Sequence, residues 1–185
     1  MKSFLNGFVL LLGMLLVVAG CNEDVDRPEA PSAASSAASS DDTLPANLIA
    51  TAQPAGDAQD VVTARKTAKD GEPITLRGTV AGSADPLADN RAMLTLLDSS
   101  IKTCDTLPGD SCKTPWDACC EPANVLAAST ASVQVTGADG KPLNTTLEGV
   151  GGIKPLSKLV VAGTARKPAD GETLQVDAAQ IFVVP

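Results

Sequence analysis

Four cysteines in the middle of the chain are the residues most able to carry chemistry. They fall within 17 residues, at Cys104, Cys112, Cys119 and Cys120. Thiols grouped in this way can form disulfides, bind a soft metal ion or take part in redox exchange. The chain contains no histidine, which excludes catalysis by a Ser-His-Asp or Cys-His arrangement and a zinc site with histidine ligands.

Two disulfides are the state that we expect for these four thiols. The number of cysteines is even, and the N-terminus, described below, directs the chain to an oxidising compartment. A bond between the adjacent Cys119 and Cys120 would need a strained ring, so we expect Cys104 and Cys112 each to bond with one member of that pair. Each bond would stabilise the fold by roughly 2–4 kcal/mol.

Metal binding and thiol redox chemistry are the two alternatives for the same thiols. Four thiolates suit Zn²⁺ or Cu(I), although the segment lacks a C-x-x-C pair and the cysteines are separated by seven, six and zero residues. Redox chemistry would need an activated thiol, and only Lys113 supplies a nearby positive charge. We therefore expect no cofactor and no catalytic residue, with Zn²⁺ or Cu(I) at the cysteines as the alternative to disulfides.

Trp116 is the single tryptophan of the chain and stands among these cysteines. Thr114 is a good N-cap residue and Pro115 suits the first helical position, so the sequence predicts one short helical turn over 115–120. Such a turn would place Trp116 and Cys119 on one face. We expect Trp116, braced by the loop, to form a contact patch for a protein partner.

The N-terminal segment has the features of a secretory signal. Lys2 provides a positive charge, and an apolar run extends from Phe4 to Val18. This run is short for a membrane-spanning helix. Small residues follow it and lead directly to Cys21.

The four residues Val18-Ala19-Gly20-Cys21 resemble the lipobox of bacterial lipoproteins. In that class the signal is removed and the cysteine carries acyl chains, which anchor a protein firmly in a membrane. The resemblance implies a signal peptide over 1–20, lipidation of Cys21 and a domain outside the cytoplasm, tethered to a membrane of the cell envelope. An Asp after the cysteine favours the inner membrane in this class; Asn22 departs from that pattern, so inner and outer membrane both stay open.

The remaining chain divides into a tether and one domain. Residues 21–46 are mostly Ser, Ala, Asp and Pro after the cysteine and have little to bury, so we expect a disordered tether there. We expect residues 47–185 to form the domain, with a cysteine-rich loop over 99–130 between its strands. The helix formers of 57–68 predict one short helix at its N-terminal side.

Alternation of apolar and polar residues predicts that the rest of the domain is built of strands. The expected strands are 74–80, 91–98, 131–136, 143–147, 156–166 and 173–184. Gly78 and Gly163 would let strands bend so that a barrel can close. Apolar residues stand in both registers past Ala178 and suggest a bulge or burial on both faces.

The strings ITLRGTV, MLTLLD, KLVVAGTA and LQVDAAQIFVV resemble the strands of OB-fold domains over residues 72–185. We therefore expect a mainly β fold, a small OB-like barrel of five or six strands, with an immunoglobulin-like sandwich as the alternative. Together with TPWDACCEP, the chain resembles bacterial lipoproteins of uncharacterised activity that carry a cysteine-rich insert in an OB-like barrel.

Net charge and aromatic content exclude further classes of function. Acidic residues outnumber basic ones by 22 to 14, which gives a net charge of −8, and aromatic residues make up 2% of the chain. An acidic surface with few aromatic rings suits neither nucleic-acid binding nor a glycosidase. We expect a non-enzymatic binding or scaffold module of the envelope, with a membrane anchor and an envelope protein as partner; a metal-handling or thiol-redox lipoprotein is the alternative.

Overall fold

The computed structural model describes residues 42–109, 111–167 and 173–185. The expected signal peptide, the lipidation site Cys21 and most of the expected tether lie outside these residues. Within them, no helix is long and apolar enough to cross a membrane.

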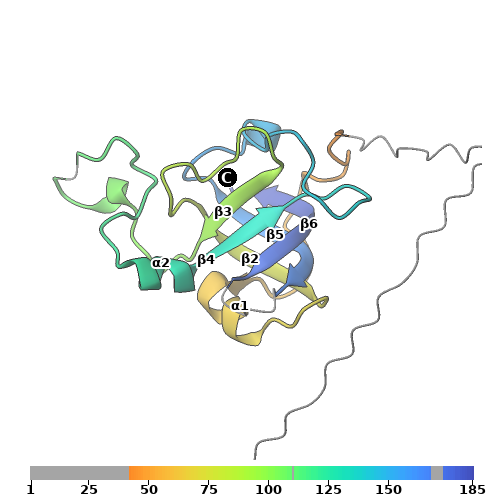
Figure 1. The fold of residues 1–185 in the computed structure, drawn as a ribbon, viewed down its shortest axis with the longest axis horizontal. Coiled ribbons are helices and arrows are strands. Elements are labelled where there is room, and N and C mark those ends of the chain that lie inside the picture. The colour runs from red at the N-terminus through yellow and green to blue at the C-terminus, as the bar shows by residue number, and fades with distance from the viewer. Residues whose placement is uncertain (1–41, 110, 168–172) are drawn as a thin grey trace, which may run out of the picture. The chain divides into compact units, whose positions relative to one another are not determined.

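Six strands, two α-helices and two short 3₁₀ helices make up the described part of the chain (Figure 1). In chain order they are β1 (Gln59–Asp60), α1 (Val61–Thr67), β2 (Pro73–Val80), β3 (Met93–Leu97), η1 (Cys104–Thr106), α2 (Ala123–Ser129), β4 (Thr130–Gln134), η2 (Val150–Gly152), β5 (Lys158–Arg166) and β6 (Gln175–Val183).

Five of the strands close into a barrel, as expected for an OB-like domain. Their order is β2-β3-β4-β6-β5, and β5 pairs back with β2. The pairs are antiparallel except β4 with β6, which run parallel. This order, with the third and fifth barrel strands side by side, is that of a five-stranded Greek-key OB barrel. Closure of one sheet rules out the alternative of a two-sheet immunoglobulin sandwich. The two-residue β1 adds to β2 in parallel.

Alternate residues of the strands point into the barrel, as the period of two predicts. Leu94 and Leu96 of β3 point into the main core, whereas Leu97 belongs to a second cluster with Ala81 and Ala118. The main core fills the barrel; its fully buried members include Leu48, Leu76, Val133, Leu159, Val176 and Ile181. The second cluster lies where the cysteine-rich loop meets the barrel, so it connects that loop to the fold.

Two glycines are required where barrel strands approach closely. A Cβ at Gly78 would lie 2.6 Å from the carbonyl oxygen of Leu97, and one at Gly163 would overlap the carbonyl oxygen of Asp177. The pairing of β5 with β6 also shifts register at Gly163, so that β6 has one extra residue, Ala179. The bulge expected past Ala178 is therefore present. Both glycines allow their strands to pair closely because they have no side chain.

Two local expectations are wrong. The chain forms a second helix, α2, instead of the predicted helical turn over 115–120. Pro122 immediately precedes α2, and the alanine-rich segment after it is a good helix former. Residues 143–147 form no strand; Leu143 and Leu147 instead fill the core from an irregular segment.

The N-terminal end of the described chain packs along the barrel. Leu44 contacts the core, Ile49 bridges to Ile181 of β6, and Asp42 accepts hydrogen bonds from the backbone and side chain of Asn144, both at 3.2 Å. Contacts of the domain therefore extend to residue 42, ahead of the boundary expected at 46.

Two acidic side chains fix α1 against the barrel. Asp98, only 3% exposed, accepts a 2.7 Å hydrogen bond from the backbone N–H of Val62, in the first turn of α1. It thereby replaces the missing side-chain cap of the helix. Asp60, the residue before α1, accepts two hydrogen bonds from Arg77 of β2, at 2.9 and 2.7 Å, and one from Ser99.

The Asp60–Arg77 pair predicts a defined dependence of stability on pH. The hydrogen bond from Arg77 holds the pKa of Asp60 below its ordinary value. The carboxylate therefore stabilises the fold above about pH 4, and this contribution is lost as the pH falls through the lowered pKa. We expect Asp60→Asn to lower the urea midpoint slightly at pH 6, since both side chains are partly exposed. The difference in urea midpoint between this variant and the unmodified chain should decrease toward pH 3. A difference that stays constant with pH would contradict the prediction.

Candidate functional site

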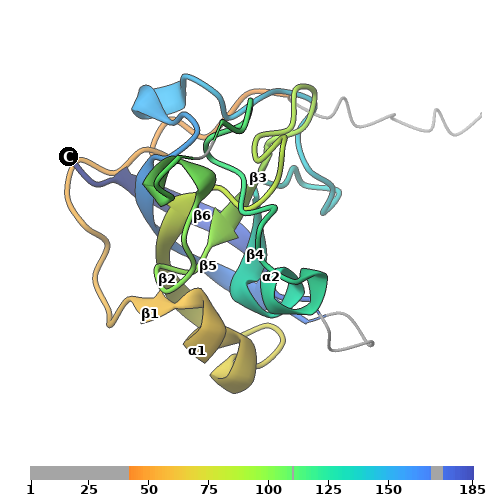
Figure 2. The same ribbon diagram turned by 90° about the vertical axis from the view of Figure 1, so that its left-hand side faces the viewer.

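The cysteines lie in an insert, residues 99–122, between β3 and α2. Figure 1 shows this segment, in green, projecting from one side of the barrel. Figure 2 shows that α2, which returns the chain to β4, lies at the same end of the barrel as α1. The insert carries one 3₁₀ turn and is otherwise irregular in its described residues, so hydrogen bonds and packing must position its thiols.

Backbone hydrogen bonds join the two ends of the insert. The N–H of Cys104 donates to the carbonyl of Asp117 at 2.8 Å, and that of Asp105 donates to the carbonyl of Pro115 at 2.9 Å. A turn then follows, in which the N–H of Glu121 donates to the carbonyl of Ala118. These bonds bring η1, which begins at Cys104, beside the turn that holds Cys119.

Trp116 fastens the insert to the barrel. Its ring packs with the second hydrophobic cluster, which contains Ala81 and Leu97, and its indole N–H donates to the carbonyl of Ala84 at 2.8 Å. Its own carbonyl accepts from the N–H of Gly82 at 3.1 Å. The half-buried ring is thus a packing element of the fold; that it also forms a contact patch for a partner stays a prediction.

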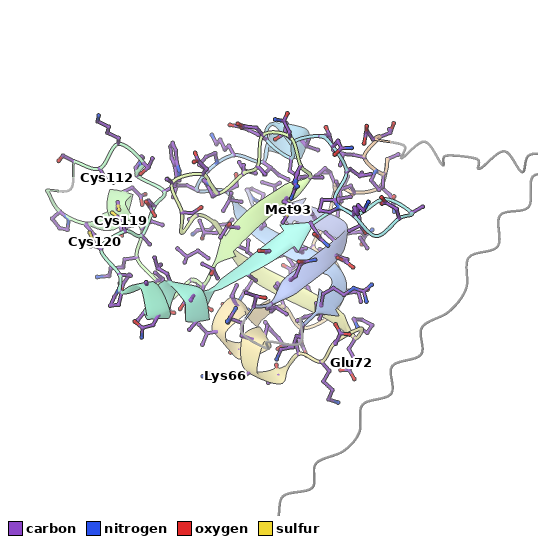
Figure 3. All side chains as sticks on the ribbon, viewed as in Figure 1. Lys66, Glu72, Met93, Cys112, Cys119 and Cys120 are labelled. Carbon is purple, nitrogen blue, oxygen red and sulfur yellow. The ribbon has the colours of Figure 1, made fainter. Side chains whose placement is uncertain are left out.

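Three of the four thiols converge on one point. The Sγ atom of Cys119 lies 3.7 Å from that of Cys104 and 3.9 Å from that of Cys112, and all three sulfurs are within 4.8 Å of one another. We call this group the three-sulfur site. Cys120 is not part of it. Figure 3 shows Cys112, Cys119 and Cys120 close together in the projecting insert.

The distances match a shared metal ion better than paired disulfides. None of the four cysteines forms a disulfide, in which the two sulfurs would lie about 2.05 Å apart. Cys104 and Cys112 both contact the same partner, Cys119, which can bond only one of them. Two sulfurs on one tetrahedral ion, with metal–sulfur bonds of about 2.3 Å, would lie about 3.8 Å apart.

The surroundings give the three thiols different acidities. Burial raises the pKa of Cys104 to about 12, and the contact between its thiol and that of Cys119 acts in the same direction. The hydroxyl of Thr114, 3.6 Å from the sulfur, holds the pKa of Cys112 below its ordinary value. The contact with Cys104 lowers the pKa of Cys119, but its contact with Cys112, burial and nearby thiolates together outweigh this and raise it. Cys112 is therefore the first of the three to ionise.

Sequence reasoning found the four cysteines but not their arrangement. It counted the absence of a C-x-x-C pair and the adjacency of Cys119 and Cys120 against a metal site. The insert instead brings together cysteines far apart in its sequence and uses only one member of the adjacent pair. It gave Thr114 only the role of an N-cap residue and missed its contact with the Cys112 sulfur, since a threonine near a cysteine carries no signal in the sequence. Among the described residues, no other set of three Cys, Asp or Glu side chains converges in this way.

Comparison with known proteins assigns no family to this chain. No protein-family model matches the chain, and no curated protein matches it. Among solved structures, the hypothetical protein YgiW of E. coli aligns over 71% of this chain and 94% of its own, with 17% identity and a TM-score of 0.39. The OB-like assignment therefore depends on the strand order and pairing of this chain itself.

Proposed function

We propose that this chain is a lipid-anchored protein of the bacterial cell envelope that binds one soft metal ion, Zn²⁺ or Cu(I), in its cysteine insert. The observation that carries the proposal is the convergence of three sulfurs, from Cys104, Cys112 and Cys119, at the distances that one bound ion requires. The anchor is proposed from Cys21 in its lipobox-like setting.

The donor set suits such an ion. Thiolates are the ligands that select Zn²⁺ and Cu(I) among common biological metals. A bound cation would deprotonate the thiols, including Cys104, whose burial favours the neutral form. Metal binding would therefore release protons and tighten as the pH rises. It would also order the insert, because three separate parts of that segment would share one centre.

The rest of the domain fits a binding module better than an enzyme. The barrel provides a rigid base to which Trp116 and Ala118 attach the insert. Without histidine, the chain lacks the usual general base and the usual catalytic zinc ligands. The acidic charge of the chain supports the expectation that nucleic acid is not its partner.

Mass spectrometry of the full chain, extracted from membranes in detergent under anaerobic conditions, tests this function. We expect a native mass that includes one metal ion, and four thiols that react with an alkylating agent after denaturation and metal removal. Acyl chains on Cys21 and the loss of residues 1–20 should appear in the same spectrum.

Oxidised cysteines would contradict the metal proposal. Two disulfides would leave no alkylatable thiol and place the unreduced mass about 4 Da below the reduced one. A chain with free thiols and no bound metal, even after incubation with Zn²⁺ and Cu(I), would also overturn it.

A further inference from the structure

The three-sulfur site is open to solvent on one side. Cys104 is only 1% exposed and forms the inner wall, Cys112 is half-buried, and Cys119 is exposed. A closed structural site would shield all of its ligands. Here the outermost ligand stands at the surface, where an incoming donor could reach a bound ion.

A fourth thiol, that of Cys120, is the neighbour in sequence of the exposed ligand Cys119. Cys120 follows Cys119 on the same turn, closed by the hydrogen bond from Glu121 to Ala118, and its side chain is exposed. The Cα atoms of adjacent residues are about 3.8 Å apart. Cys120 is therefore beside the site without belonging to the converging group.

The number and kind of donors favour Cu(I) over Zn²⁺. Structural zinc is almost always held by four ligands, whereas this group offers three, and no carboxylate of the described residues joins them. All three donors are soft thiolates, which is the set that suits Cu(I). A d¹⁰ ion with three sulfur ligands can accept a further thiolate before it releases one.

We propose that Cys120 is the exchange ligand through which Cu(I) enters and leaves the three-sulfur site. This inference rests on the proposed function, since it needs a bound ion. In the release step the Cys120 thiol gives its proton to solvent and its sulfur bonds to Cu(I). One bond between Cu(I) and a cluster sulfur then breaks, and that sulfur takes up a proton. An acceptor thiol or chelator then displaces the two remaining cluster sulfurs in turn, each of which takes up a proton, and finally takes the ion from Cys120, which is reprotonated by solvent. Copper stays Cu(I) throughout, so the sequence needs no oxidant or reductant.

The test is the rate at which the full chain, loaded anaerobically with Cu(I), gives copper to the coloured chelator bicinchoninate. We expect Cys120→Ser to slow this transfer by about tenfold or more. Residues around a metal site typically change its metal affinity or activity by about 10–100-fold. Copper per chain is measured in the same samples. Cys120→Met should restore part of the rate, because a thioether is also a soft ligand for Cu(I) but cannot form a disulfide.

The outcomes separate this inference from the proposed function. If the unmodified chain binds neither Cu(I) nor Zn²⁺, the proposed function fails. If it binds Zn²⁺ and not Cu(I), the proposed function stands and the exchange inference is wrong. If Cys120→Ser binds copper and releases it as fast as the unmodified chain does, the site stands and the exchange role is wrong. Loss of bound copper in Cys120→Ser would make Cys120 a resident ligand and overturn the inference, as would a slow rate that methionine does not restore.

Discussion

Replacing Cys119 with serine is expected to weaken metal binding by at least about a hundredfold. Changes around a metal site that spare its ligands already cost 10–100-fold, and Cys119 is the sulfur that both other members of the three-sulfur site contact, at 3.7 and 3.9 Å. A serine hydroxyl is a hard, neutral donor that does not replace a thiolate for a soft ion. Titration of the full chain with Cu(I) and with Zn²⁺, each against a competing chelator, measures the change.

Glu121→Gln provides the matched control for Cys119→Ser. Glu121 lies on the same turn and carries a carboxylate, yet it is not among the converging groups. We expect this variant to bind metal as the unmodified chain does, which would show that a change within the turn is not itself enough to abolish binding. If Cys119→Ser keeps an affinity within a few-fold of the unmodified chain, the three-sulfur site is not where the metal binds.

Replacing Gly163 with alanine is expected to destabilise the barrel by about 3 kcal/mol or more, the upper part of the range for overpacking. The added methyl group would overlap the backbone carbonyl of Asp177, and a backbone atom cannot move aside as the end of a side chain can. The affected pairing, β5 with β6, is one of the barrel seams. Urea unfolding of the full chain, followed by far-ultraviolet circular dichroism, reports the loss.

Gly137→Ala is the control for this substitution. A methyl group at Gly137 would lie 3.2 Å from the end of the Leu143 side chain, which can shift. Its urea midpoint should therefore change much less. Equal midpoints for Gly163→Ala and the unmodified chain would show that β5 and β6 can separate at this point without cost.

The barrel could be predicted from the sequence because its information is local. Apolar residues alternate along β2 and β3, so their faces and their approximate bounds follow from a period of two. Gly78 and Gly163 also stood out, because a glycine inside a strand pattern marks a bend or a close approach. The structure confirms both positions and supplies the reason, which is contact with a neighbouring backbone.

The insert could not be predicted, because its structure depends on contacts between distant residues. The cap signals at Thr114 and Pro115 produce only one turn, in which the N–H of Asp117 donates to the carbonyl of Thr114. No helix continues from this turn: the N–H of Ala118 donates to the carboxylate of Asp117 at 2.7 Å, and the carbonyl of Asp117 accepts from the N–H of Cys104. The convergence of the three sulfurs follows from this path of the backbone. Neither the spacing of the cysteines nor their number predicts it.

The placement of Trp116 has an optical consequence. The chain has no tyrosine and no second tryptophan, so its emission on excitation near 295 nm comes from this single indole. That indole lies where the insert meets the barrel, with its N–H bonded to the carbonyl of Ala84. Its emission wavelength and intensity therefore report whether the insert is docked. The chain thus contains its own label-free fluorophore for following the insert in real time.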